Sequence, residues 1–153
     1  CASKNTTSWA SFKYNKTYLR TGPSKNNKVI WVYKRKGLPF KILRQKNEWS
    51  EVLLPSSQKG WINSSQISKK RNVLIQNTRS SVELALSSQK EIIITDKNLK
   101  TLAYVKEGVI AALSGCMEEL CKIELKVKKD KYFFKNSYKL SGYIRRDFLW
   151  GVD

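Results

Sequence analysis

Gly60-Trp61-Ile62 and its echo, Gly142-Tyr143-Ile144, are the two stretches that decide the fold. Each triplet places a glycine before an aromatic and a β-branched residue, near the end of a run of short segments in which apolar and polar residues alternate. Such alternation is typical of half-buried strands, and no helical periodicity is sustained over the length of a helix. The sequence therefore predicts an all-β protein in which each triplet forms the closing strand of a small barrel.

A repeat relates the two halves of the chain. Moving the sequence by 71 positions places Gly37 on Gly108, whereas Gly60 meets Gly142 only after 82 positions. The second copy therefore carries an insertion of eleven residues, which we place near 127–139. This pattern predicts two tandem small barrels, with short 3-10 or helical turns before their last strands.

The predicted boundaries follow from composition. Residues 1–11 are mostly polar and are interpreted as an N-terminal tail or tether. Residues 12–76 form the first barrel, with a last strand around 72–75, and residues 77–153 form the second barrel. No apolar run approaches the roughly 18–20 residues that span a bilayer.

Charge is the strongest compositional signal. Thirty Lys and Arg residues against twelve Asp and Glu give a formal net charge of +18. A solvated, lysine-rich surface accounts for this charge, and the alternative is attraction to a polyanion such as nucleic acid, anionic lipid or an acidic envelope polymer. We favour the solvated surface, because the densest basic runs, at 34–36 and 69–71, are only three residues long.

The chain contains no histidine, which removes the usual general base and the commonest metal ligand. Three cysteines without histidine are too few for a tetrahedral zinc site, and a Ser-His or Cys-His catalytic pair is impossible within the chain. The remaining Asp, Glu, Lys and Cys residues show no spacing that nominates a catalytic site. We therefore expect a non-enzymatic protein without a metal or cofactor.

The three cysteines separate into a pair and a single residue. Cys116 and Cys121 flank four residues, the length of a normal hairpin loop, so a disulfide across neighbouring strands is favoured over two buried thiols. A disulfide implies an oxidising compartment. Cys1, followed by a polar tail, is typical of a processed bacterial lipoprotein whose first cysteine is lipidated; an arbitrary start of the chain is the alternative.

Tyr18-Leu19-Arg20-Thr21-Gly22-Pro23-Ser24 resembles the Asn-Leu-Arg-x-Gly-Pro-Ser block of bacterial SH3-like (SH3b) domains, with Tyr18 where Asn is usual. The segments 31–35, 48–52 and 60–62 resemble the later strands of that family in order. The second copy is similar to the second half of tandem alphaproteobacterial SH3 proteins, although it has no counterpart of the 20–24 turn. The resemblance implies half-open SH3-like barrels that bind cell-wall peptides or protein partners in the bacterial envelope.

Ligand-binding candidates are aromatic or basic residues near the predicted barrel surface. Trp31 and Tyr33 share one face of their strand, which leads to Arg35, and that face is either the core or an exposed aromatic-basic strip. Arg20 is a candidate carboxylate ligand, and the alternative role is to brace the turn that follows it. Tyr132 and Phe133 lie in the insertion, where they either meet a partner or pack the copies together.

The two tryptophans in the barrel strands, Trp49 and Trp61, are interpreted as core residues, with an aromatic groove for an extended peptide as the alternative. The function predicted from these features is a binding module of the cell envelope, periplasmic or secreted, which recognises a peptidoglycan peptide or glycan or an envelope protein. The alternative is a basic, nucleic-acid-binding barrel. A membrane enters this interpretation only through a lipid anchor at Cys1.

Overall fold

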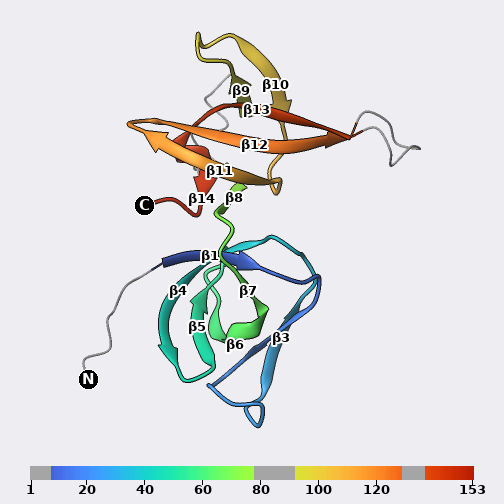
Figure 1. The fold of residues 1–153 in the computed structure, drawn as a ribbon, viewed down its shortest axis with the longest axis vertical. Coiled ribbons are helices and arrows are strands. Elements are labelled where there is room, and N and C mark those ends of the chain that lie inside the picture. Colours follow the sequence, from blue (N-terminus) through green and yellow to red (C-terminus); the bar gives the residue numbers. More distant parts are fainter. Residues whose placement is uncertain (1–7, 78–91, 129–136) are drawn as a thin grey trace. The chain divides into compact units, whose positions relative to one another are not determined.

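The computed structural model describes residues 8–77, 92–128 and 137–153. The chain divides into two compact units, residues Cys1–Asn72 with Asp153 and residues Val73–Val152. Nearly all regular structure in the described residues is β-strand, with two short 3-10 helices (Figure 1). Among these residues, no helix is long and apolar enough to cross a membrane.

The first unit is one antiparallel sheet of seven strands, in the order β3-β2-β6-β5-β4-β1-β7. A 3-10 helix, η1, connects β6 to β7. The bounds are β1 Ser8–Phe12, β2 Thr17–Arg20, β3 Val29–Tyr33, β4 Pro39–Lys46, β5 Trp49–Leu53, β6 Lys59–Asn63, η1 Ser64–Gln66 and β7 Ile67–Ser68.

The second unit repeats this topology strand for strand, in the order β10-β9-β13-β12-β11-β8-β14. A second 3-10 helix, η2, again precedes the last strand. The bounds are β8 Asn72–Ile75, β9 Ile92–Thr95, β10 Thr101–Val105, β11 Ile110–Met117, β12 Leu120–Lys128, β13 Ser137–Arg145, η2 Arg146–Phe148 and β14 Leu149–Trp150. The prediction of two tandem SH3-like barrels with short 3-10 turns is confirmed.

Two predicted boundaries differ from the structure. The strand Ser8–Phe12 pairs with β4 and β7, so residues 8–11 belong to the first sheet and are not a tether. The strand Asn72–Ile75 pairs with β14 and opens the second unit instead of ending the first. In both cases the pairing partner is distant in sequence, and local composition carries no signal for such pairing.

The strands β1 and β8 hold equivalent positions in the two units. In each unit, the glycine that precedes β4 or β11 donates its amide to the last residue of β1 or β8. Gly37 N donates to Phe12 O at 2.9 Å, and Gly108 N donates to Ile75 O at 2.7 Å. Both glycines have positive φ, +85° and +88°, where a side chain is strained. The glycine match at 71 positions therefore marks one turn that is built twice.

The glycines of the two triplets are required by close strand approach. A Cβ at Gly60 would lie 2.5 Å from Leu19 Cγ and 3.0 Å from the Arg20 carbonyl oxygen. At Gly142 it would contact Ile94 Cγ2 and lie 3.0 Å from the Thr95 carbonyl oxygen. The triplets therefore lie in β6 and β13, where each barrel brings this strand against its second strand, β2 or β9.

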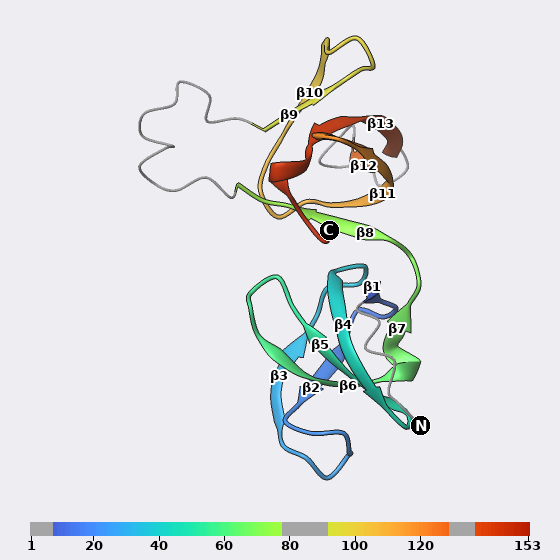
Figure 2. The same cartoon turned by 90° about the vertical axis from the view of Figure 1, so that its left-hand side faces the viewer.

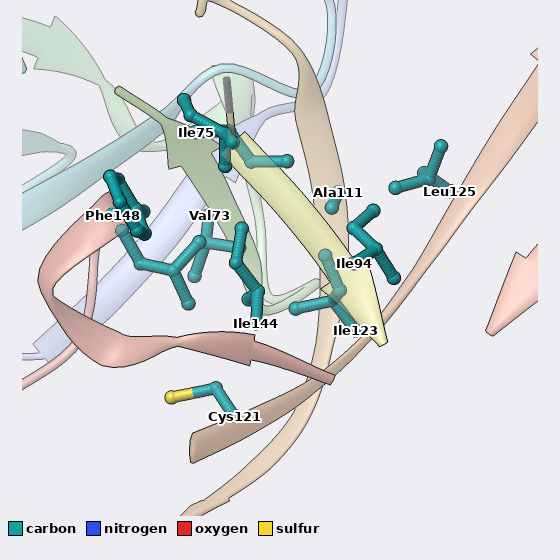
Figure 3. Packing of buried hydrophobic residues seen from close by; sticks show 11 residues of the cluster. Val73, Ile75, Ile94, Ala111, Cys121, Ile123, Leu125, Ile144 and Phe148 are labelled. Carbon is teal, nitrogen blue, oxygen red and sulfur yellow. The ribbon is translucent and has the colours of Figure 1, made fainter. Parts of the chain in front are cut away.

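Each unit has its own apolar core. In the first unit the Phe12 ring lies 5.0 Å from the Phe40 ring, and Trp61 is only 6% exposed. In the second unit β-branched residues fill the equivalent space, with Ile75, Ile94 and others pointing to a common centre (Figure 3). Trp61 is thus a core residue, as predicted.

The predicted insertion corresponds to a longer β12–β13 hairpin. The first copy ends its equivalent pairing at Leu53↔Lys59, whereas the second continues through Leu125↔Leu140 to Lys128↔Ser137. Residues 129–136, the central part of the predicted insertion at 127–139, lie outside the described residues.

Candidate ligand-binding groove

The described part of the first unit contains a surface groove of about 390 Å³. Its walls come from β2 and the turn after it on one side, and from β5, β6 and η1 on the other. The lining residues are Lys16, Tyr18, Arg20, Lys25, Trp49, Asn63, Ser65 and Gln66. Three are cations, two are aromatic, and none is acidic.

The alternation of side chains along β2 determines which of its residues line the groove. Thr17 and Leu19 are buried, so Tyr18 and Arg20 point away from the core. Tyr18 remains 45% exposed. Lys16 Nζ lies 5.3 Å from the centre of the Tyr18 ring, and Arg20 Cζ lies 5.9 Å from it. These distances are within the range of cation–π attraction, so the groove wall is an aromatic ring flanked by two positive charges.

The opposite wall is held by hydrogen bonds around η1. Asn63 Oδ1 accepts the Ser65 amide at 3.0 Å and caps this helix. Ser64 N donates to the carbonyl oxygen of Glu48 at 2.8 Å, which ties the helix to the β4–β5 turn. Trp49, directly after that turn, is half-buried and presents its remaining surface to the groove.

Arg20 braces the turn that forms one end of the groove. Its Nη1 donates to the carbonyl oxygens of Lys25 and Asn27, both at 3.1 Å. Of the two roles weighed for this residue, the structure contains the brace. The same side chain also lines the groove, so its positive charge faces any bound ligand.

The predicted strip at 31–35 lies outside the groove lining. Trp31 is 58% exposed, so of the two placements left open for its face, core or exposed strip, this residue takes the exposed one. Tyr33 is half-buried: its ring lies 5.4 Å from the Phe12 ring and its hydroxyl donates to Gln58 Oε1 at 2.8 Å. Arg35 is exposed. The structure thus does not assemble Trp31, Tyr33 and Arg35 with Arg20 into one site.

Three other predicted residues lie outside the described part of the chain, namely Tyr132, Phe133 and Cys1. Ligand contact by the first two and lipidation of the third remain predictions.

Sequence reasoning missed Lys16, Tyr18 and Lys25 and assigned Trp49 to the core. Tyr18 did carry a signal, because it stands where the SH3b block usually has asparagine. Trp49 could not be separated from Trp61 by sequence, since both lie in short segments in which apolar and polar residues alternate. The structure separates them, because only Trp49 borders the 3-10 helix.

The second unit has different side chains at the equivalent positions. The residue that matches Trp49 is Leu120, at the start of β12. The residues that match Asn63 and Ser65 are Arg145 and Asp147, which form an ion pair of 2.9 Å. A groove of the same chemistry is therefore not repeated at these positions.

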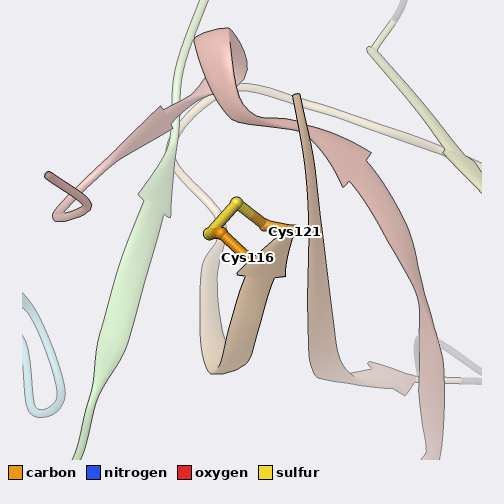
Figure 4. Close-up of a disulfide and its surroundings, with 2 residues drawn as sticks. All are labelled: Cys116 and Cys121. Atoms are coloured by element: carbon orange, nitrogen blue, oxygen red, sulfur yellow. A yellow bond between two sulfur atoms is a disulfide. The ribbon is translucent and has the colours of Figure 1, made fainter. Parts of the chain in front are cut away.

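The structure joins Cys116 and Cys121 in a disulfide across the β11–β12 hairpin (Figure 4). The two residues are direct partners in the register of these strands. Cys121 is fully buried, so one end of the disulfide packs into the second core.

No group of three or more potential metal ligands occurs among the described residues. One pKa in this part of the chain is clearly shifted. Burial lowers the pKa of the Arg71 guanidinium, and the nearby Asp153 carboxylate partly offsets this effect. Arg71 does not line the groove.

Residues 13–69 match the family described as bacterial SH3 domain. The match spans β2 to β7 and every residue that lines the groove. It confirms the SH3b resemblance for the first barrel. Bacterial SH3 domains are generally non-catalytic binding modules. The tandem alphaproteobacterial type stays a prediction. No curated protein matches the chain.

Solved structures resemble the chain only distantly. NlpC2 from Trichomonas vaginalis is 13% identical with a TM-score of 0.38, and the match covers 97% of this chain and 49% of that one. NlpC1 from the same organism is 13% identical with a TM-score of 0.37, and the match covers 97% of this chain and 47% of that one. An NlpC/P60 family protein from Bacillus cereus is 12% identical with a TM-score of 0.37, and the match covers 94% of this chain and 56% of that one. The chain spans about half the length of these proteins, and at this similarity no argument rests on them.

Proposed function

We propose that this protein is a binding module of the bacterial cell envelope whose first barrel holds an extended, anionic peptide segment of the cell wall or of an envelope protein. The observation that carries the proposal is the basic and aromatic groove between β2 and η1, on the barrel that matches the bacterial SH3 domain family.

The groove chemistry supports a ligand that carries carboxylates. Lys16, Arg20 and Lys25 supply positive charge, and no acidic residue lines the groove to oppose a negative ligand. Tyr18 and Trp49 supply flat apolar surface on opposite walls, which suits a ligand without a large side chain of its own. Peptidoglycan stem peptides are short, extended and rich in free carboxylates, so they fit both properties.

The disulfide supports a location outside the cytoplasm. Cytosolic thiols are kept reduced in most organisms, so a disulfide in a hairpin favours the periplasm or the extracellular space. We place the protein in the cell envelope on this ground. Lipid anchoring at Cys1 belongs to the same proposal.

Sedimentation with insoluble peptidoglycan tests the proposal. We expect the protein to pellet with the polymer at low salt and the variants Tyr18→Ser and Lys25→Glu to remain in solution. The backbone of Lys25, which Arg20 binds, is unchanged by the second substitution. Lys36→Glu changes an exposed residue outside the groove and is the control for net charge.

Equal binding by Lys25→Glu and Lys36→Glu would show that the overall charge, not the groove, causes pelleting. No pelleting of the wild-type protein would exclude the cell-wall ligand.

A single-stranded nucleic acid is the second candidate, because a basic groove with two aromatic walls also suits stacked bases. Oligonucleotide binding at about 50 mM salt distinguishes the two ligands. Nucleic acid is favoured if an oligonucleotide binds and its affinity falls in Tyr18→Ser but not in Lys36→Glu.

A further inference from the structure

The β9–β10 hairpin of the second unit exposes large apolar side chains. Leu99 at its tip is 66% exposed, and Leu102 and Tyr104 on β10 are 45% and 63% exposed. The hairpin projects from the other strands of the second sheet, and the turn that joins β9 to β10 forms its outer end (Figure 2). Exposed leucine and tyrosine gathered on one projecting hairpin are typical of a contact surface.

Leu99 is held in its exposed place by the turn. Its φ of +65° is unfavourable for a leucine, and its amide donates to the Asp96 carbonyl oxygen at 3.0 Å. Asp96 Oδ1 accepts the amides of Asn98 and Lys100 at 2.8 and 2.9 Å. Asp96 N donates to Lys100 O at 2.8 Å. The turn is thus fixed by hydrogen bonds and keeps the leucine at its tip.

Positive charge surrounds the apolar residues. Lys97, Lys100 and Lys106 are exposed along this hairpin and its end. Within the described residues 92–108, which contain this hairpin, the two carboxylates are engaged within the protein: Asp96 with its turn, and Glu107 Oε1 with the Asn77 amide at 2.6 Å. The hairpin therefore presents leucine and tyrosine within a basic surround.

The first unit lacks this arrangement at the equivalent tip. The turn between β2 and β3 contains the polar Lys25, Asn26 and Asn27, and Arg20 is bound to its carbonyl oxygens. Trp31 on β3 is exposed, but it lies on the strand and not at a tip. The apolar tip is a property of the second barrel alone, so it does not follow from the shared fold.

We propose that the β9–β10 hairpin binds the surface of an anionic lipid bilayer, with Leu99, Leu102 and Tyr104 entering the interfacial region and the lysines pairing with lipid phosphates. This combination is what an anionic bilayer surface accepts: apolar side chains enter the acyl boundary, tyrosine lies at the headgroups, and lysine adds electrostatic attraction. A water-soluble polyanion accounts for the lysines but leaves the tip leucine in water. The proposal is independent of the groove in the first barrel.

Co-sedimentation of the full chain with vesicles tests the proposal. We expect binding to vesicles of phosphatidylglycerol and phosphatidylcholine and much weaker binding to phosphatidylcholine alone. Leu99→Asn should weaken binding about tenfold, since a buried leucine contributes roughly that much or more. Lys97→Glu should weaken it about fivefold or more. Asparagine tolerates positive φ, so Leu99→Asn keeps the turn. The unfolding transition of the variant should match that of the wild type, which would confirm an intact fold.

Trp31→Asn is the matched control, because it removes an exposed apolar residue from the equivalent strand of the first barrel. It should leave vesicle binding unchanged. If Leu99→Asn and Trp31→Asn bind vesicles as the wild type does and only salt releases the protein, adsorption is purely electrostatic and the proposal is wrong. If Leu99→Asn lowers binding to insoluble cell wall but not to vesicles, the hairpin contacts a wall polymer and the lipid assignment is overturned.

Discussion

Replacing Gly60 by alanine tests whether the repeated triplet serves the fold or a ligand. Gly60 lies in extended strand, so alanine adds no backbone strain, only one carbon atom. That atom would lie 2.5 and 2.7 Å from two carbons of Leu19 and 3.0 Å from the Arg20 carbonyl oxygen. Leu19 is completely buried and the carbonyl belongs to the backbone of β2, so the two strands must move apart.

The cost of such a clash follows from core overpacking. One extra methyl group in a well-packed interior destabilises a protein by about 1–3 kcal/mol. For a unit of this size each kcal/mol lowers Tm by roughly 4–8 °C, so Gly60→Ala should lower the melting temperature of the first unit by about 4–24 °C. Four of the five tryptophans belong to the first unit, so the thermal change in tryptophan fluorescence reports mainly this transition.

Gly115→Ala is the control. Gly115 lies in β11, and a Cβ there meets no atom within 4 Å. The change should be neutral or stabilise the second unit by about 0.5–1 kcal/mol, because glycine is unfavourable inside a strand. If Gly60→Ala is as stable as the wild type and instead loses binding, the triplet contacts a ligand and the closing-strand argument is refuted.

Three further predictions follow from the structure. Reducing the Cys116–Cys121 disulfide should destabilise the second unit by about 2 kcal/mol, as expected for a short closed loop, and leave peptidoglycan binding unchanged; calorimetry with and without reductant measures this. Glu118 has φ of +53°, as does its equivalent Asn47, so Glu118→Asn should stabilise the protein by about 0.5–1 kcal/mol and Asn47→Glu should do the reverse in urea unfolding. Arg20→Lys loses the paired bonds to the β2–β3 turn and should raise amide exchange there and weaken ligand binding severalfold; unchanged exchange would contradict the brace.

The sequence predicted the parts of the fold that depend on local signals. The turn at Gly37 and Gly108 requires positive φ, and the two triplets require close approach of neighbouring strands. Each requirement therefore places a glycine at the equivalent position of both barrels. The strand Asn72–Ile75 was assigned to the wrong barrel because its pairing with β14 crosses most of the second unit. A few adjacent residues are enough to indicate a strand, but which strand it pairs with depends on the complete sheet.

The groove was harder to predict than the barrel for a related reason. It forms where β2 meets η1, and these elements are separated in sequence by almost the whole first unit. Its residues are ordinary surface types, so no single one is distinctive. Arg20 was selected because it belongs to a known motif, whereas Lys16 and Lys25 became candidates only when the structure placed them beside Tyr18.

The two barrels share the same framework but differ on their surfaces. The structure explains why surface residues can change while the framework stays the same. Residues that repeat, such as Gly60 and Gly142, face the interior or a neighbouring strand, where a change disturbs packing. Residues that differ, such as Trp49 and Leu120, lie at strand ends whose outer faces meet solvent, so their replacement leaves the core intact. A duplicated barrel can therefore lose one binding surface without losing its fold. This freedom accounts for a groove in the first barrel and an apolar hairpin tip in the second.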